Sequence, residues 1–167
     1  MNQLLKKVWN IVATVLVTAA VILALLLVGV RVLGLQVYAV LSGSMEPAYH
    51  TGSLIYVQKT APEEIQVGDA ITFVMDESLT VATHRVVAVD EEKRFFTTKG
   101  DANDTVDGAP VAFENLIGKP VLTIPYLGYF SNFIQSPPGV YIAIGAGGII
   151  LLLAFLPDLL QGKKQKG

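Results

Sequence analysis

The 167-residue chain is 52% hydrophobic with a mean hydropathy of +0.54, which is too apolar for an ordinary soluble domain of this length. The formal net charge is −2 and no basic stripe with interleaved aromatic residues occurs, which argues against a nucleic acid as partner. Cysteine is absent, so neither disulfide bonds nor thiolate chemistry can contribute.

The apolar excess lies at the two ends of the chain. Residues 8–30 carry no charge, and at about 1.5 Å per residue they would form a helix of about 34 Å, enough to cross a hydrocarbon core of about 30 Å. The apolar run continues to Leu35 and is broken only by Arg31, so we predict a retained anchor rather than a removable signal peptide. Residues 139–156 either span as well or lie in the interface. We expect them to span, because their central glycines are common in transmembrane helices.

Lysines flank both predicted spans and set the expected orientation. Lys6 and Lys7 precede the first span, and three more lysines follow the second in the C-terminal tail. Positive residues favour the cytoplasmic side, so the chain is predicted to be a multi-pass protein of the cell membrane with its middle part outside. The expected segments are a cytoplasmic N-terminus at 1–7, transmembrane helices at 8–33 and 138–160, an extracytoplasmic domain at 34–137, and a cytoplasmic tail at 161–167.

Between the spans the chain changes to short runs of β-forming residues that are separated by turn residues. This pattern predicts a mainly β fold, either a sandwich or a partly open barrel, in one domain held by its core alone. Strands are expected at residues 37–41, 54–57, 70–75, 79–89 and 94–99, with turns at 76–78 and 90–93.

The first polar stretch after the anchor, residues 41–47, contains the best candidate nucleophile, Ser44. A serine hydroxyl is a weak nucleophile, so chemistry would require a base to take its proton and donors to hold the oxyanion that forms. Ser42 offers a second hydroxyl beside it. Ser-Gly-Ser before a proline is also ordinary turn chemistry, and this stretch taken alone favours that interpretation.

His84 is one of two histidines in the chain and lies in a predicted strand. Alternate residues of a strand share a face, which would place His84 with Ala82, Val86 and Ala88. On this small apolar face a core histidine satisfied by a backbone carbonyl is favoured, and a catalytic base is the alternative. His50, in the loop that follows the serine stretch, is expected to be structural or solvated.

Two later segments leave alternatives open. The loop at residues 99–108 holds three aspartates. Their spacing does not match a calcium loop, so no metal site is predicted and turn chemistry is favoured. Residues 124–130 contain three aromatic side chains and no charge, which fits either an interfacial surface or a core strand.

Four motifs follow one another in the chain: Ser42-Gly43-Ser44-Met45-Glu46-Pro47, His84-Arg85-Val86, Thr98-Lys99-Gly100-Asp101-Ala102-Asn103 and Ile124-Pro125-Tyr126-Leu127-Gly128. They resemble the successive conserved boxes of the signal peptidase I family, over the part of the chain from the first span to about Gly128. The second box has His84 where the usual bacterial members have a lysine. The chain therefore resembles the endoplasmic-reticulum and archaeal branch, which also occurs in some Gram-positive bacteria and often has a C-terminal span.

This resemblance implies a serine endopeptidase that needs no cofactor. Ser44 would be the nucleophile and His84 the general base, with the Ser42 hydroxyl and the Ser44 backbone N–H as the oxyanion hole. Asp107 and Asp101 both remain candidates for the acid that orients the imidazole. Asp107 is favoured because it aligns with the aspartate of that branch, which would leave Asp101 as a structural partner and Asp104 as a solvated residue.

The resemblance further implies that the substrates are signal peptides of exported preproteins, cut after small residues beside the lipid bilayer. The scissile peptide would lie as an added strand between two runs of the domain. A non-catalytic membrane-anchored scaffold and a serine peptidase that acts on folded regulatory proteins are the alternatives, and additional membrane subunits are left open. The expected substrate-binding residues are Val37, Ala39, Leu41, Val81, Ala82 and Thr83.

Overall fold

The computed structural model describes residues 3–75 and 79–162, and these form two compact units. One unit holds the two long helices and the other, Val30–Asn132, holds every described strand. The predicted turn at 76–78 and the lysines of the C-terminal tail lie outside the described residues.

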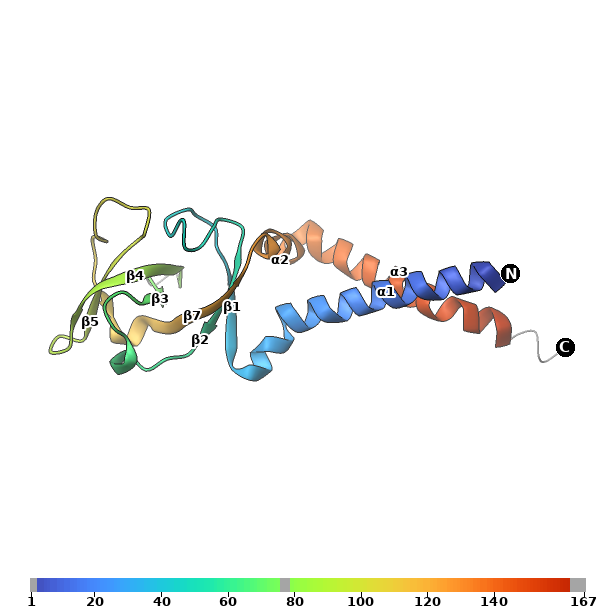
Figure 1. Ribbon diagram of the computed structural model, residues 1–167, viewed down its shortest axis with the longest axis horizontal. Coiled ribbons are helices and arrows are strands. Elements are labelled where there is room, and N and C mark those ends of the chain that lie inside the picture. Colours follow the sequence, from blue (N-terminus) through green and yellow to red (C-terminus); the bar gives the residue numbers. More distant parts are fainter. Residues whose placement is uncertain (1–2, 76–78, 163–167) are drawn as a thin grey trace. The chain divides into compact units, whose positions relative to one another are not determined.

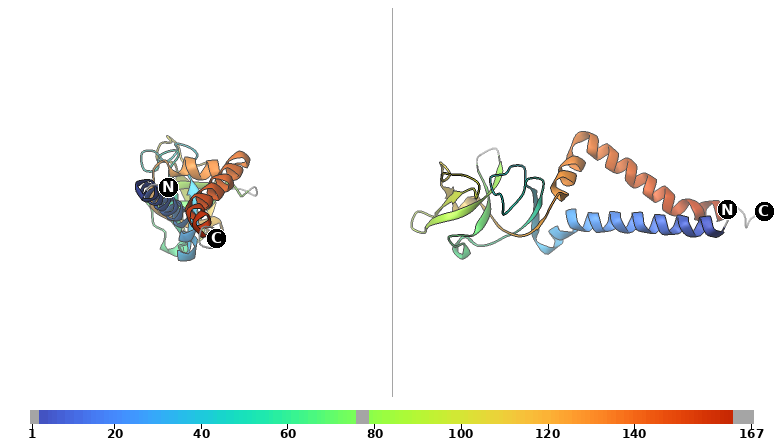
Figure 2. Two further views of the ribbon diagram at one scale, coloured as in Figure 1. Left: turned by 90° about the vertical axis from the view of Figure 1, so that its right-hand side faces the viewer. Right: turned by 45° about the horizontal axis from the view of Figure 1, so that its top comes forward.

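In the helical unit, α1 (Gln3–Leu27) and α3 (Pro137–Gly162) pack against each other near the chain termini (Figure 2). The Trp9 indole N–H donates a hydrogen bond to the Leu153 carbonyl at 3.0 Å. All of α1 and residues Pro137–Phe155 of α3 are long and apolar enough to cross a membrane. The first helix ends earlier than the predicted boundary at residue 33, because a separate 3₁₀ helix, η1 (Gly29–Leu33), follows it.

The strand unit is one curled, antiparallel sheet of seven strands, which is a partly open barrel rather than a sandwich (Figure 1). Two predicted strands are shifted: the first begins and ends two residues earlier than expected, and the fourth begins two residues later. The spatial order is β1-β2-β7-β3-β4-β5-β6. In chain order the strands are β1 (Leu35–Ala39), β2 (Leu54–Gln58), β3 (Ala70–Val74), β4 (Val81–Asp90), β5 (Phe95–Lys99), β6 (Val111–Ala112) and β7 (Leu116–Ile124).

The central strand β7 joins the two halves of the sheet, since its first residues pair with β3 and its later residues with β2. Sequence analysis did not predict it. Pro120 lies at the irregularity in the pairing of β7 with β2, where a missing backbone N–H is tolerated. After β7, the chain forms a helix, α2 (Leu127–Gln135), so the core-strand reading of residues 124–130 was wrong.

The core lies inside the β3–β4–β5 half of the sheet. Phe96 and Phe113 stack with ring centroids 4.4 Å apart, and such a pair adds about 1 kcal/mol beyond area burial. A β-bulge in β4 skips one residue of the pairing between Val86 and Ala88. Ala88 is therefore exposed and does not share the face of His84, as the strict alternation had predicted, whereas Val89 packs on the core. The buried core residues are Ile65, Ile71, Phe73, Val86, Phe96, Val111 and Phe113.

Candidate active site

The loop between β1 and β2 holds Ser44 through backbone hydrogen bonds and one buried anchor. Met45, directly after the serine, is 2% exposed and fixes the loop in the interior. The Ser44 carbonyl accepts from the Ala102 N–H at 2.9 Å, which ties this loop to the 99–108 loop. Gly100 is required at this contact, because an added Cβ would come within 2.6 Å of the Ser44 carbonyl oxygen. The third motif is thus fastened directly to the backbone of the candidate nucleophile.

His84 lies between Ser44 and Asp107. Its Nδ1 is 2.6 Å from the Asp107 Oδ2, and its Nε2 is 3.1 Å from the Ser44 Oγ. An ionised carboxylate only accepts, so Nδ1 carries the hydrogen, and Nε2 of the neutral ring accepts from the serine hydroxyl. Phe73, on the neighbouring strand β3, packs edge-on against the imidazole with centroids 6.3 Å apart. The arrangement has the geometry of a nucleophile, a base and an orienting acid.

Asp107 has a second partner that sequence analysis did not single out. The Thr98 hydroxyl donates to the Asp107 Oδ2 at 2.6 Å, and the Asp107 N–H donates to the Thr98 carbonyl at 2.9 Å. Thr98 is fully buried, so its hydroxyl is a fixed donor that holds the carboxylate toward the imidazole. Thr98 is the first residue of the third motif. A threonine in a predicted strand, shortly before an acidic loop, was the signal available in the sequence.

Asp101 binds a different residue, Arg85, which directly follows His84 in β4. The Arg85 Nε and Nη2 donate to the two carboxylate oxygens at 2.7 and 2.6 Å, and Nη1 donates to the Gly68 carbonyl at 2.7 Å. The hydrogen bonds with Asp101 raise the pKa of Arg85 above its ordinary value. This bidentate pair joins β4 to the 99–108 loop and to the turn before β3. Asp104 is exposed, as predicted.

Tyr49 and Asp69 are two further titratable groups near the Arg85–Asp101 ion pair. Burial raises the pKa of the Tyr49 phenol, an effect that the charge of Arg85 opposes. Partial burial raises the pKa of Asp69, but the hydrogen bonds from Lys119 and from the Gln66 N–H outweigh it and leave the pKa below its ordinary value. Lys119 Nζ lies 2.7 Å from the Asp69 Oδ2 and so ties β7 to the start of β3.

Ser42 lies beside the candidate nucleophile, with its Oγ 3.3 Å from the Ser44 Oγ. Since the Ser44 proton points to His84, the Ser42 hydroxyl donates in this contact. His50 is exposed and lies 3.9 Å from the Glu46 carboxylate, away from the Ser44–His84–Asp107 chain of contacts.

The predicted substrate-binding residues lie on two strand edges that have no partner strand within residues 3–75 and 79–162. The N–H and C=O of Val40 bond toward β2, so by alternation the backbone groups of Val37, Ala39 and Leu41 face away from it. Leu41 lies just past the end of β1 and is exposed.

In β4, the N–H and C=O of Val86 bond toward β3, so the backbone groups of Val81 and Thr83 face the other side. On that side β5 pairs only from Arg85 onward. Ala82 shares the face of His84. The Ser44–His84 contact brings the end of the β1 edge to the end of the β4 edge.

Comparison with known proteins relates the chain to signal peptidases. A family model described as signal peptidase, peptidase S26, matches residues 12–117. Signal peptidase I W of Bacillus subtilis is 40% identical over 122 residues, which cover 67% of this chain and 64% of that protein, slightly less than two thirds of its length. The signal peptidase complex catalytic subunit SEC11 of Candida tropicalis is 30% identical, with 73% of this chain and 78% of that protein covered. The SEC11C subunit of Rattus norvegicus is 29% identical, with 70% and 67% covered.

Proposed function

The chain belongs to the signal peptidase family, peptidase S26, and from this premise we propose that it is a membrane-bound serine endopeptidase that removes signal peptides from exported preproteins. The observation that carries the proposal is the chain of contacts from Ser44 through His84 to Asp107, at 3.1 and 2.6 Å. A membrane-anchored scaffold would need none of these contacts, and the family match does not favour that alternative.

In the proposed reaction the Ser44 Oγ attacks the scissile carbonyl while the His84 Nε2 takes the hydroxyl proton. Asp107, fixed by Thr98, keeps the hydrogen on Nδ1 and stabilises the imidazolium that forms. The imidazolium then returns the proton to the leaving amine of the mature protein, and an acyl group remains on Ser44. Water, deprotonated by the same imidazole, hydrolyses this ester and releases the signal peptide.

The substrate is proposed to bind as an extended strand between the free edges of β1 and β4. The outward backbone groups of Val37, Ala39 and Leu41 on one side and of Val81 and Thr83 on the other would pair with it. The small side chains of Ala39 and Ala82 would leave room for small residues directly before the cut and third before it. Such residues match the cleavage-site pattern of signal peptides.

The test of this function varies the substrate. Membranes that contain the chain are expected to cut a reporter preprotein with alanine at the first and third positions before the cut, and to cut it at least about tenfold less with phenylalanine at either position. Membranes with the Ser44→Ala chain at equal abundance measure the background. Cleavage that is indifferent to these residues, or that persists in the Ser44→Ala membranes, would contradict the proposal.

Both long helices are proposed to span the membrane, with both termini in the cytoplasm and the strand unit outside. The lysines beside the helices support this orientation. On sealed vesicles in which a protease outside digests the strand unit, a tag after Gly167 is expected to be protected. Digestion of the tag and the strand unit from the same side would show that the second helix does not span.

Ser42 is proposed to supply one donor to the oxyanion, with the Ser44 backbone N–H as the other. Loss of one such donor lowers the rate by about 10²- to 10³-fold, so a Ser42→Ala chain is expected to be slow but active. The measurement is the single-turnover rate on the reporter. An unchanged rate would assign the Ser42 hydroxyl to turn structure.

A further inference from the structure

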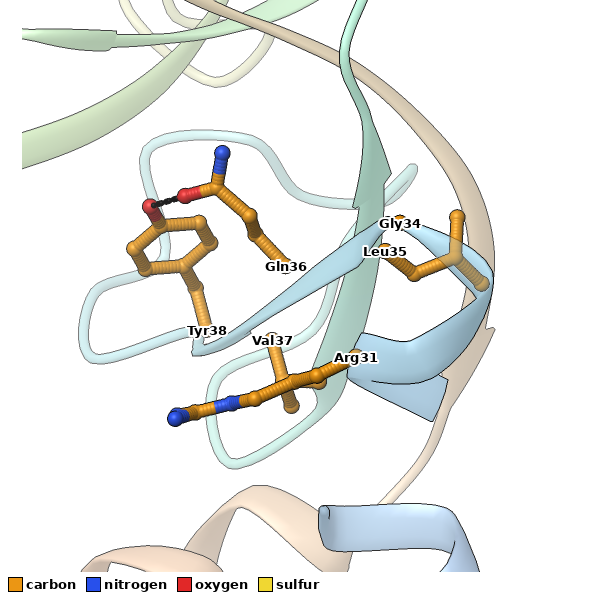
Figure 3. Close-up of a pocket in the computed structure, with 6 residues that line it drawn as sticks. All are labelled: Arg31, Gly34, Leu35, Gln36, Val37 and Tyr38. Carbon is orange, nitrogen blue, oxygen red and sulfur yellow. Dashed lines mark hydrogen bonds between the residues drawn. The ribbon is translucent and has the colours of Figure 1, made fainter. Parts of the chain in front are cut away.

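The chain between α1 and β2 forms a pocket of about 400 Å³ along β1, where this strand begins. Figure 3 shows that the Arg31 side chain extends along β1 on the side of Val37, whereas Gln36 and Tyr38 lie on the other side. Gly34, with φ +77°, makes the turn into β1, and an added Cβ there would meet nothing within 4 Å. The pocket is lined by Arg31, Gly34, Leu35, Gln36, Val37 and Tyr38.

On the Val37 side of β1, the pocket presents a hydrogen-bond donor group, the Arg31 guanidinium, without a described acceptor. The Arg31 guanidinium makes no hydrogen bond or salt bridge to any residue that the structure describes. The Tyr38 hydroxyl donates to the Gln36 Oε1 at 2.7 Å, which leaves the amide hydrogens of Gln36 to donate elsewhere. A guanidinium offers five N–H donors and favours carbonyl and carboxylate oxygens. The ligand of this pocket should therefore be rich in acceptors.

The position of the pocket along β1 indicates which part of a substrate would reach it. The free edge of β1 ends near Ser44 and begins at Leu35, which follows the end of α1 by eight residues. In the proposed binding mode the residues directly before and third before the cut lie beside Ala39 and Ala82, so residues further before the cut run along β1 toward Leu35. Leu41 and Leu35 are six residues apart, about 20 Å of strand, so the segment about five to seven residues before the cut reaches the pocket.

We propose that Arg31 is a specificity-determining residue that holds the substrate segment five to seven residues before the scissile bond by its oxygen acceptors and disfavours lysine or arginine there. This inference rests on the proposed function. At that distance from the cut the apolar part of a signal peptide ends, and if that part is helical its last carbonyls lack partners and carry partial negative charge. An acidic side chain in the same segment would bind by the same chemistry, and a basic one would be repelled.

The test is a charge exchange between enzyme and substrate. Two reporters differ only in aspartate or lysine at the sixth residue before the cut, and both are cleaved in neutral phosphatidylcholine vesicles. The wild-type chain is expected to cut the aspartate reporter with about five- to tenfold higher kcat/KM, mainly through KM. Arg31→Gln should reduce this preference to about one, Arg31→Lys should restore most of it, and Arg31→Glu should reverse it.

Arg94→Gln is the matched control, because Arg94 lies at the β4–β5 turn, where it contacts Glu63, Glu114 and Phe113. It should keep the wild-type preference. Equal cleavage of both reporters by the wild type would overturn the inference about Arg31 but would agree with the proposed function. If the wild type cleaved neither reporter, the proposed function itself would be contradicted. A further arm adds phosphatidylglycerol to the vesicles. If added phosphatidylglycerol changes the cleavage rate of both reporters equally, and no longer does so with the Arg31→Gln chain, the pocket holds a lipid phosphate. This outcome would also overturn the inference.

Discussion

Replacement of His84 with alanine is expected to lower the rate of reporter cleavage about 10⁶-fold, to the level of the Ser44→Ala chain. In the proposed reaction, the 3.1 Å contact between the His84 Nε2 and the Ser44 Oγ makes the two side chains one catalytic unit. Without the imidazole the hydroxyl proton has no acceptor, and without the hydroxyl the imidazole has nothing to activate. The double variant Ser44→Ala/His84→Ala should therefore be no slower than either single variant. The measurement is the single-turnover rate at equal enzyme abundance.

His50 provides the matched control, because it is the other histidine and is exposed beside Glu46. His50→Ala should keep the wild-type rate. Independent, additive losses in the double variant would show that His84 and Ser44 do not act as a unit.

His84→Lys should not restore activity, although lysine takes this position in other members of the family that the sequence resembles. A lysine base must be neutral at working pH, which requires a desolvated site. Here the Asp107 carboxylate, 2.6 Å from the imidazole, would instead stabilise the charged ammonium. Near-normal turnover by His84→Lys would contradict the view that this site is built for imidazole.

Sequence patterns predicted most of the strands, because a strand buried in a sheet needs a short run of apolar, β-forming side chains and such a run is visible in the sequence. The run at residues 54–57 is apolar throughout and β2 is buried on both faces. The central strand β7 escaped prediction because Gly118 and Pro120 read as breakers. Both lie where the pairing of β7 is irregular, and that irregularity depends on neighbours distant in the chain.

The sequence also left the choice between the two aspartates open for a physical reason. Asp101 and Asp107 lie in one loop, and no local rule states which carboxylate reaches a strand elsewhere in the chain. The choice in the structure depends on Thr98 and Arg85, each of which binds one of the two. The buried threonine directs Asp107 to the imidazole, and the fork-shaped guanidinium takes Asp101.

The last prediction separates these two carboxylates. Asp107→Asn keeps the size of the side chain, but its amide N–H₂ can donate to the His84 Nδ1 and so force the hydrogen onto Nε2. The imidazole in that tautomer cannot take the serine proton, and the rate should fall on the order of 10⁴-fold with little change in thermal stability. The reporter rate and the melting temperature are measured on the same membrane preparation.

Asp101→Asn is the matched substitution, and it should lower the thermal stability clearly and the rate less than Asp107→Asn does. It breaks the bidentate pair with Arg85, whose side chain is 34% exposed against 17% for Asp101. Loss of a partner from a fully buried pair costs about 3–5 kcal/mol, and the partial exposure here lowers the expected cost to about 2 kcal/mol. The melting temperature should fall by several degrees, with a smaller loss of rate because the neighbouring Ala102 N–H holds the Ser44 carbonyl. A fully active Asp107→Asn beside a folded but inactive Asp101→Asn would require the two roles to be exchanged.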